Sequence, residues 1–136
     1  MPAGYSGTPL VRELGIKSGQ RLALVNQPEG YSETLCPMPE GAKVARLLDG
    51  PLDFIHFFTT GAGELEREFP QLKSALSPDG TLWVSWPKRS SRVATDLNGN
   101  VVRDIGLGNG LVDVKVCAVD ETWSALKFVF RLKDRT

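Results

Sequence analysis

The chain has 136 residues, of which 41% are hydrophobic and 24% are charged, and its 16 Lys and Arg residues balance its 16 Asp and Glu residues. This composition is typical of a globular protein and excludes the disordered and collagen-like classes. A net charge of +0 provides no long-range field to attract nucleic acid or an anionic membrane, so we expect neither partner. The length predicts a single domain over residues 1–136.

The cysteines and the apolar runs indicate the cellular compartment. Cys36 and Cys117 form no C-x-x-C motif, so we expect two free thiols, as in a cytoplasmic protein. No basic segment followed by an apolar run opens the chain, and nowhere do about eighteen apolar residues occur together. The sequence therefore predicts a cytoplasmic protein with neither an export signal nor a membrane span.

Local signals predict short elements in the first third of the chain. Thr8 as N-cap, with Pro9 in the first turn, predicts a helix of about two turns. A nearly continuous apolar run over residues 21–26 predicts a central strand that is buried on both faces. Repeated Pro and Gly in residues 27–41 predict a loop with one helical turn near residues 31–35.

One long helix is predicted between buried strands. Four apolar residues recur at helical spacing between residues 63 and 76, namely Leu65, Phe69, Leu72 and Leu76. Pro70 lies among them and is expected to interrupt the helix, and the Ser-Pro-Asp-Gly sequence of residues 77–80 predicts a turn. The strands predicted around this helix are residues 43–48, 52–59 and 81–86.

The C-terminal part predicts a second helix and a hairpin. Thr95 or Asp96 is expected to cap the helix, and residues 112–119 and 124–132 predict antiparallel strands joined by residues 120–123. The alternation of strands and helices predicts an α/β fold with a single Rossmann-like, mostly parallel sheet. We expect helices on the faces of this sheet and the antiparallel hairpin at its C-terminal end.

The second half of this pattern resembles class I methyltransferase folds. The segments that carry the resemblance are residues 52–59, 72–76, 77–80 and 81–86. It implies that the last strand, residues 124–132, inserts between earlier strands and runs antiparallel to them. Such enzymes usually place a glycine-rich loop directly after the first strand, where this chain reads Asn-Gln-Pro-Glu-Gly over residues 26–30. The stretch from residue 26 to residue 43 is also too short for a full crossover helix and the usual acidic ribose-binding strand end.

The whole chain more closely resembles a bacterial family of small uncharacterised proteins defined as a domain of unknown function. The motifs that carry this resemblance are GYSGTPL at residues 4–10, SWPK at residues 85–88, ATD at residues 94–96 and DETWS at residues 120–124. The family name implies no activity.

The carboxyl ends of the parallel strands are where ligands bind in open α/β sheets. Three loops, residues 26–30, 59–61 and 85–91, should converge there, and the third offers hydroxyls and cations for a small anionic ligand with a carboxylate or phosphate. The candidate ligand-binding residues are Asn26, Glu29, Gly30, Thr59, Ser85, Trp86 and Lys88. The alternative is that Trp86 packs over the sheet edge and residues 88–92 form a solvated loop.

The sequence predicts no catalytic residue, no metal site and no cofactor. His56 is the single histidine and lies inside an apolar strand, so we expect a hydrogen-bonded core histidine rather than a catalytic base. One His and two distant Cys residues show no metal-ligand spacing. We interpret the Asp120-Glu121 pair as a cap of the hairpin turn and the GLGNG sequence of residues 106–110 as a helix-terminating turn. Trp123 either covers the hairpin or anchors a partner.

Three functional hypotheses follow. The first is a non-catalytic binding or interaction module that keeps a methyltransferase-like sheet without its cofactor loop. The alternative is a small S-adenosylmethionine-dependent methyltransferase-like enzyme that uses a pocket beside Asn26, Thr59 and Trp86. The third is a subunit whose half-polar hairpin pairs with a partner protein or with a second copy as a homodimer.

Overall fold

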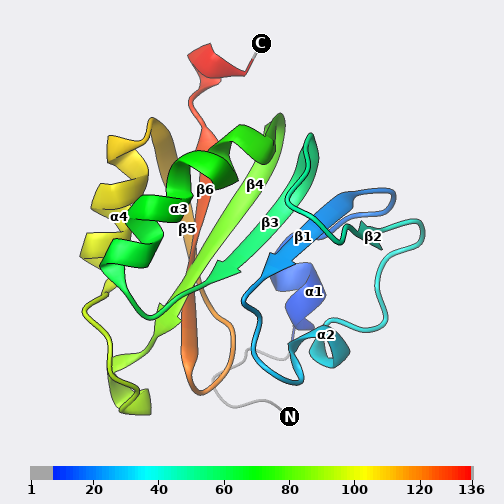
Figure 1. The fold of residues 1–136 in the computed structure, drawn as a ribbon. Coiled ribbons are helices and arrows are strands. Elements are labelled where there is room, and N and C mark those ends of the chain that lie inside the picture. The colour runs from blue at the N-terminus through cyan, green and yellow to red at the C-terminus, as the bar shows by residue number, and fades with distance from the viewer. Residues whose placement is uncertain (1–7, 136) are drawn as a thin grey trace.

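The computed structural model describes residues 8–135, which form one six-stranded sheet with the strand order β2-β1-β3-β4-β6-β5 (Figure 1). The strands are β1 (Arg21–Val25), β2 (Lys43–Val44), β3 (Leu52–Phe58), β4 (Leu76–Pro87), β5 (Leu111–Ala118) and β6 (Trp123–Phe130). The helices are α1 (Leu10–Glu13), α2 (Tyr31–Thr34), α3 (Ala62–Ala75) and α4 (Gly99–Gly108), with 3-10 turns at Arg89–Ser91 and Leu132–Asp134. The predicted α/β class is confirmed.

The centre of the sheet is parallel and its C-terminal edge is antiparallel. β1, β3 and β4 pair in parallel, with Leu22 beside Phe54 and Ile55 beside Leu82. β6 lies between β4 and β5 and is antiparallel to both, which confirms the insertion of the last strand. Each central strand is a run of mostly apolar residues because both of its faces are covered.

The two faces of the sheet bury separate clusters. On one face α3 and α4 contribute Leu65, Phe69 and Val102 to an apolar core, and on the other α1 and α2 contribute Leu10 and Tyr31 (Figure 1). The second face includes a hydrogen bond in which Trp83 Nε1 donates to the Leu14 carbonyl at 2.9 Å. The helices packed on the two faces thus hold the central strands β1, β3 and β4 in place.

The predicted interruption at Pro70 is wrong, because α3 is continuous through that residue. Proline removes one backbone N–H from the helix, which costs stability. The buried face that includes Leu65, Phe69 and Leu72 is held against the sheet on both sides of Pro70. Tertiary packing therefore outweighs the local loss of a hydrogen bond.

The predicted turn at residues 77–80 is a bulge inside β4. Leu52 of β3 pairs with Leu76 and Phe54 pairs with Thr81, so residues 77–80 of β4 lie opposite a single residue of β3. A Cβ at Gly80 would lie 2.9 Å from the Leu52 carbonyl oxygen, which explains why glycine occupies this position. The turn-forming residues thus bend the strand without ending it.

The predicted cap of the second helix is also corrected. Asn98, rather than Thr95 or Asp96, is the N-cap of α4, and its Oδ1 accepts a hydrogen bond from Val101 N at 2.9 Å. Asp96 instead caps α3, because its Oδ1 accepts from Ala62 N at 2.8 Å. α4 continues to Gly108, so Gly106 lies inside the helix instead of ending it.

Two elements near the N-terminus are shorter than predicted. α1 begins at Leu10 after Pro9 and is a single turn, and β2 is confined to two of the six residues predicted. The motif at residues 4–10 falls mostly outside the described residues. Over residues 8–135, no helix is long and apolar enough to cross a membrane.

Candidate functional site

The carboxyl ends of β1 and β3 are tied together by backbone geometry and by Asn26. Asn26 follows β1 with a φ of 59°, in the left-handed region that asparagine tolerates. Its side-chain Nδ2 donates to the Phe58 carbonyl at 3.2 Å. On the other side of β3, Thr59 N donates to the Ser85 carbonyl at 3.1 Å. The three loops predicted to converge therefore begin side by side.

The Thr59 hydroxyl is committed to the start of α3. Its side chain is buried, its Oγ1 donates to Glu64 Oε1 at 2.5 Å, and it accepts from Gly61 N at 3.2 Å. These bonds satisfy groups in the first turn of a helix that has no capping side chain at its own N-cap. Thr59 thus organises the loop between β3 and α3.

A buried polar network joins α2, β3 and β4 near the carboxyl ends of these strands. His56 Nδ1 lies 2.5 Å from the Tyr31 hydroxyl, and His56 Nε2 lies 2.6 Å from Ser85 Oγ. His56 and Ser85 are fully buried and Tyr31 nearly so. Burial lowers the pKa of His56 from 6.5 to about 3, so the ring is neutral and has one donor and one acceptor nitrogen. The prediction of a hydrogen-bonded core histidine is confirmed.

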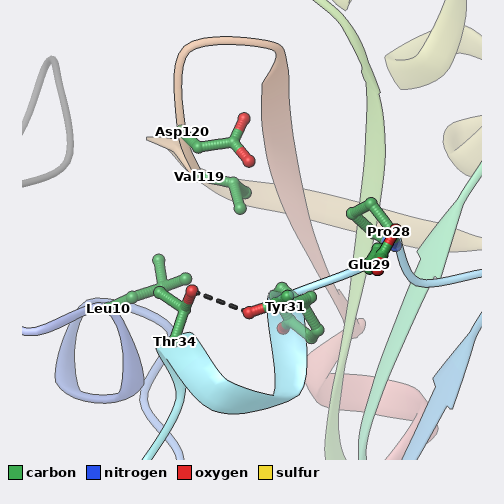
Figure 2. A pocket seen from close by; sticks show the side chains of 8 residues that line it. Leu10, Pro28, Glu29, Tyr31, Thr34, Val119 and Asp120 are labelled. Atoms are coloured by element: carbon green, nitrogen blue, oxygen red, sulfur yellow. Dashed lines mark hydrogen bonds between the residues drawn. The ribbon is translucent and has the colours of Figure 1, made fainter.

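A small cavity lies beside the loop that follows β1, and we call it the loop cavity (Figure 2). Its volume is about 160 Å³. The lining residues are Leu10, Pro28, Glu29, Gly30, Tyr31, Thr34, Val119 and Asp120. One of its edges is held by Thr34 Oγ1, which donates to the Gly30 carbonyl at 2.9 Å. Glu29 and Gly30 are the two predicted site residues that meet here.

The hairpin between β5 and β6 closes one side of the loop cavity with Val119 and Asp120. Neither residue was among the predicted ligand-binding residues. Asp120 Oδ1 accepts from Thr122 N and from Trp123 N, both at 2.8 Å, so this carboxylate caps the turn as predicted. The Trp123 ring meets Phe58 edge to face with centroids 5.2 Å apart. Lys88 N donates to the Thr122 carbonyl at 2.7 Å. The only signal for this arrangement was the insertion of the last strand beside β4.

A larger cavity lies on the α3/α4 side of the strand ends, and we call it the arginine cavity. Its volume is about 420 Å³. The lining residues are Trp86, Pro87, Arg89, Arg92, Val93, Ala94, Thr95, Asp96, Leu97 and Asn98. Thr95 Oγ1 donates to the Thr60 carbonyl at 2.6 Å, which holds the lining segment against the loop after β3.

The predicted site residues therefore fall into three groups. Glu29 and Gly30 line the loop cavity, and Trp86 lines the arginine cavity. The side chains of the second group, Asn26, Thr59 and Ser85, hydrogen-bond within the strand ends. Lys88 belongs to the lining of neither cavity and is tied through its backbone to the hairpin. The arginines of the larger cavity were part of the predicted polar loop but not of the predicted site.

Three solved structures that are similar to this chain are named as methyltransferases. A "SAM dependent methyltransferase from Aquifex aeolicus" aligns with a TM-score of 0.66 at 16% identity, covering 88% of this chain and 86% of that chain. A magnesium protoporphyrin IX methyltransferase from Synechocystis, solved with bound S-adenosylmethionine, aligns with a TM-score of 0.56 at 13% identity and 90% and 74% coverage. A precorrin-6y C5,15-methyltransferase from Geobacter metallireducens aligns with a TM-score of 0.58 at 8% identity and 90% and 86% coverage.

These similarities define the fold of this chain as a methyltransferase-like Rossmann fold. At such low identity they carry the fold alone. No protein-family model matches the sequence, and no curated protein matches it.

Proposed function

We propose that this chain is a non-catalytic binding module that keeps the sheet of a class I methyltransferase and does not hold S-adenosylmethionine. The observation that carries the proposal is the geometry of residues 26–30, the loop after β1. In dinucleotide-type sites this loop brings backbone N–H groups and a helix N-terminus close to the cofactor. The same position in this chain offers few such groups.

Two backbone positions of the loop after β1 have no N–H to offer a ligand. Pro28 has no N–H, and the N–H of Tyr31 donates back to the Pro28 carbonyl at 3.2 Å. α2 that follows has 4 residues, so its N-terminus has little dipole to offer an anionic or polar ligand. Gly30 is the one glycine of the loop, which leaves a single position for close backbone approach.

Space and charge at this end also argue against the cofactor. The loop cavity of about 160 Å³ is smaller than the roughly 300 Å³ at which small-molecule sites begin. Its wall includes the buried side chains of Leu10, Tyr31 and Val119. Packing around these side chains keeps them from moving aside to enlarge the cavity for a ligand. Class I methyltransferases usually carry an acidic residue for the ribose at the end of the second strand. In this chain the first charged residue after β2 is Arg46, which has the opposite charge. The residues present therefore do not fit S-adenosylmethionine.

The polar groups at the strand ends support binding rather than chemistry. Ser85 and His56 form a hydrogen-bonded pair, but both are fully buried and no substrate atom can reach them. A nucleophile and its base need an accessible reacting atom at hydrogen-bond distance. We therefore assign this pair a structural role that joins β3 and β4.

Calorimetry tests the proposal on the full chain. S-adenosylmethionine and its demethylated product S-adenosylhomocysteine are titrated separately into the protein, and no binding heat is expected at millimolar ligand. A methyltransferase of the same fold, titrated under the same conditions, serves as the positive control. Micromolar binding of either compound would overturn the proposal.

The second candidate function is a small S-adenosylmethionine-dependent enzyme. The observation that favours it is the alignment with the Aquifex aeolicus methyltransferase, in which 88% of this chain and 86% of that chain are covered. A minimal enzyme of similar size therefore exists on this fold. This candidate predicts micromolar affinity for the cofactor and protection of residues 26–31 from amide exchange when it binds.

A binding module also needs a surface for its partner, and β5 supplies the clearest candidate. β5 is an outer strand of the sheet, and Val114 and Val116 on it are 55% and 66% exposed. Exposed apolar side chains on an edge strand favour pairing with another chain. Light scattering that finds a monomer at high protein concentration would contradict pairing between two copies.

A further inference from the structure

The arginine cavity has a largely buried tryptophan in its wall. Trp86 is 8% exposed and lines this cavity. Its indole N–H donates to no acceptor within residues 8–135. The other buried tryptophan differs, because Trp83 Nε1 donates to the Leu14 carbonyl at 2.9 Å.

An indole nitrogen is a donor only, and a buried one normally has a partner. A buried donor without an acceptor is costly, because it loses its bond to water and gains none in the protein. The cavity beside Trp86 has a volume of about 420 Å³, which lies within the range of small-molecule sites at roughly 300–1,000 Å³. The acceptor for this N–H therefore has room to come from a ligand.

Positive charge gathers around the same cavity. Arg89 and Arg92 line it, both are exposed, and within the described residues neither guanidinium pairs with a carboxylate. Arg92 adopts a φ of 64°, and the turn is held by Ser91 Oγ, which donates to the Lys88 carbonyl at 2.7 Å and accepts from Val93 N at 3.2 Å. The turn therefore fixes the backbone from which both arginines extend.

The N-terminus of α4 adds to this positive potential. α4 has 10 residues, and its N-cap Asn98 lines the cavity. Asn98 Oδ1 accepts from Val101 N, so this capping bond leaves the amides of Gly99 and Asn100 unused. The one acidic residue in the lining is Asp96, whose Oδ1 already accepts from Ala62 N at 2.8 Å. Two guanidinium groups and a helix N-terminus outweigh this single carboxylate.

We propose that the arginine cavity binds an oxyanion, a carboxylate or a phosphate, carried on an apolar group. The Trp86 indole N–H donates to one oxygen, Arg89 and Arg92 pair with the others, and the apolar group packs against Val93 and Leu97. This inference names the ligand class of the proposed binding module. It depends on a cavity separate from the loop cavity, so it can fail while the proposed function holds.

The test follows the indole N–H signals of the three tryptophans in nitrogen-15 NMR spectra of the full chain. The signal of Trp86 is identified with the Trp86→Phe variant and that of Trp123 with Trp123→Phe. Phenyl phosphate and benzoate are the two oxyanion probes, and benzyl alcohol is the neutral control of similar size. We expect the Trp86 signal to shift with at least one oxyanion and with no neutral compound, while the signals of Trp83 and Trp123 stay in place.

A double variant inside the cavity and a control variant outside it sharpen the test, and all the substituted arginines are exposed. The double variant Arg89→Gln, Arg92→Gln should weaken the affinity for the responding oxyanion by about tenfold or more, because it removes charge-assisted hydrogen bonds. Arg46→Gln removes an exposed arginine outside the cavity lining and should leave the affinity unchanged. A response to phenyl phosphate alone assigns the site to phosphates, and a response to benzoate alone assigns it to carboxylates.

The proposal is overturned by a Trp86 signal that moves with neither probe, by an equal shift with benzyl alcohol, or by unchanged affinity in the double arginine variant. S-adenosylmethionine binding would shift amides of residues 26–31 instead. Failure of this inference and failure of the proposed function therefore give different spectra.

Discussion

The two faces of the sheet are covered in different ways. On one face α3 and α4, with 14 and 10 residues, pack on an apolar core. On the other face α1 and α2 have 4 residues each, and much of the cover comes from loops. The loop after β1, where methyltransferases of this fold hold their cofactor, belongs to the thinly covered face. The comparison teaches that short elements and loops are enough to cover one face of this sheet when long helices bury the opposite face.

The faces also differ in polarity. The α3/α4 side packs apolar side chains, including Phe69 and Phe128, whose rings meet edge to face at 5.7 Å, and the buried Thr59 hydroxyl lies at the start of α3, where it bonds to Glu64. The α1/α2 side contains the network of Tyr31, His56 and Ser85. Packing therefore stabilises one face, and a satisfied polar network helps to hold the shorter elements on the other. Three sets of measurements on variants test this difference.

The largest effect is expected at Gly106, where α4 packs directly on the sheet. A Cβ at this position would overlap the Phe128 ring, with Cδ1 only 2.7 Å away. The Phe128 side chain is fully buried and cannot move freely. Gly106→Ala should lower the free energy of unfolding by about 2 kcal/mol, the overpacking cost less the better helix propensity of alanine. Urea denaturation of both proteins measures the difference.

Gly108 in the same helix is the matched control. A Cβ there would meet no atom within 4 Å. Gly108→Ala should leave stability unchanged or raise it by about 0.5 kcal/mol. If both variants were equally stable, the packing of α4 would not be the feature that supports this face.

Most of the fold could be predicted because burial has a period in sequence. The apolar runs of β1, β3 and β4 predict parallel central strands, and alternation in β5 and β6 predicts the hairpin. The errors occur where a local preference is overruled by a distant contact. Pro70 lies inside α3 because the apolar face holds the helix, and residues 77–80 stay in β4 because Leu76 still pairs with Leu52.

The candidate site was predictable only as a location. The carboxyl ends of parallel strands follow from the strand order, so the three loops were expected to meet. Hydrogen bonds between residues far apart in the chain decide which side chains remain available to a ligand. For example, the Ser85 hydroxyl is hydrogen-bonded to His56, which lies 29 positions away in the sequence. The Trp86 donor is identified by the absence of an acceptor in the described residues, which no local pattern encodes.

A pH titration tests the polar network of the thinly covered face. The folded protein keeps His56 neutral because burial lowers its pKa from 6.5 to about 3, whereas the unfolded chain takes up a proton below 6.5. The unfolded state then binds more protons, so stability falls as the pH falls. Between about pH 7.5 and about pH 5.5 the loss should be about 1.4 kcal/mol. Urea denaturation at several pH values measures it.

His56 is the single histidine, which makes the comparison simple. His56→Gln should be less stable at neutral pH, because Tyr31 and Ser85 lose their partner geometry, and its stability should be nearly independent of pH in this range. Equal pH slopes for the two proteins would show that His56 is not the group responsible.

The smallest effect compares the N-caps of one helix on each face. Gly30 precedes α2 with a φ of 87°, and Gly61 precedes α3 with a φ of −130°, and a Cβ at either position would meet nothing within 4 Å. Both alanine variants replace glycine at an N-cap, so the capping preference largely cancels between them. Only Gly30→Ala forces a side chain into the left-handed region, at a cost of about 1 kcal/mol. Gly30→Ala should therefore be less stable than Gly61→Ala by that amount in urea denaturation. Equal stabilities would mean that the loop after β1 relaxes to a different backbone conformation in Gly30→Ala.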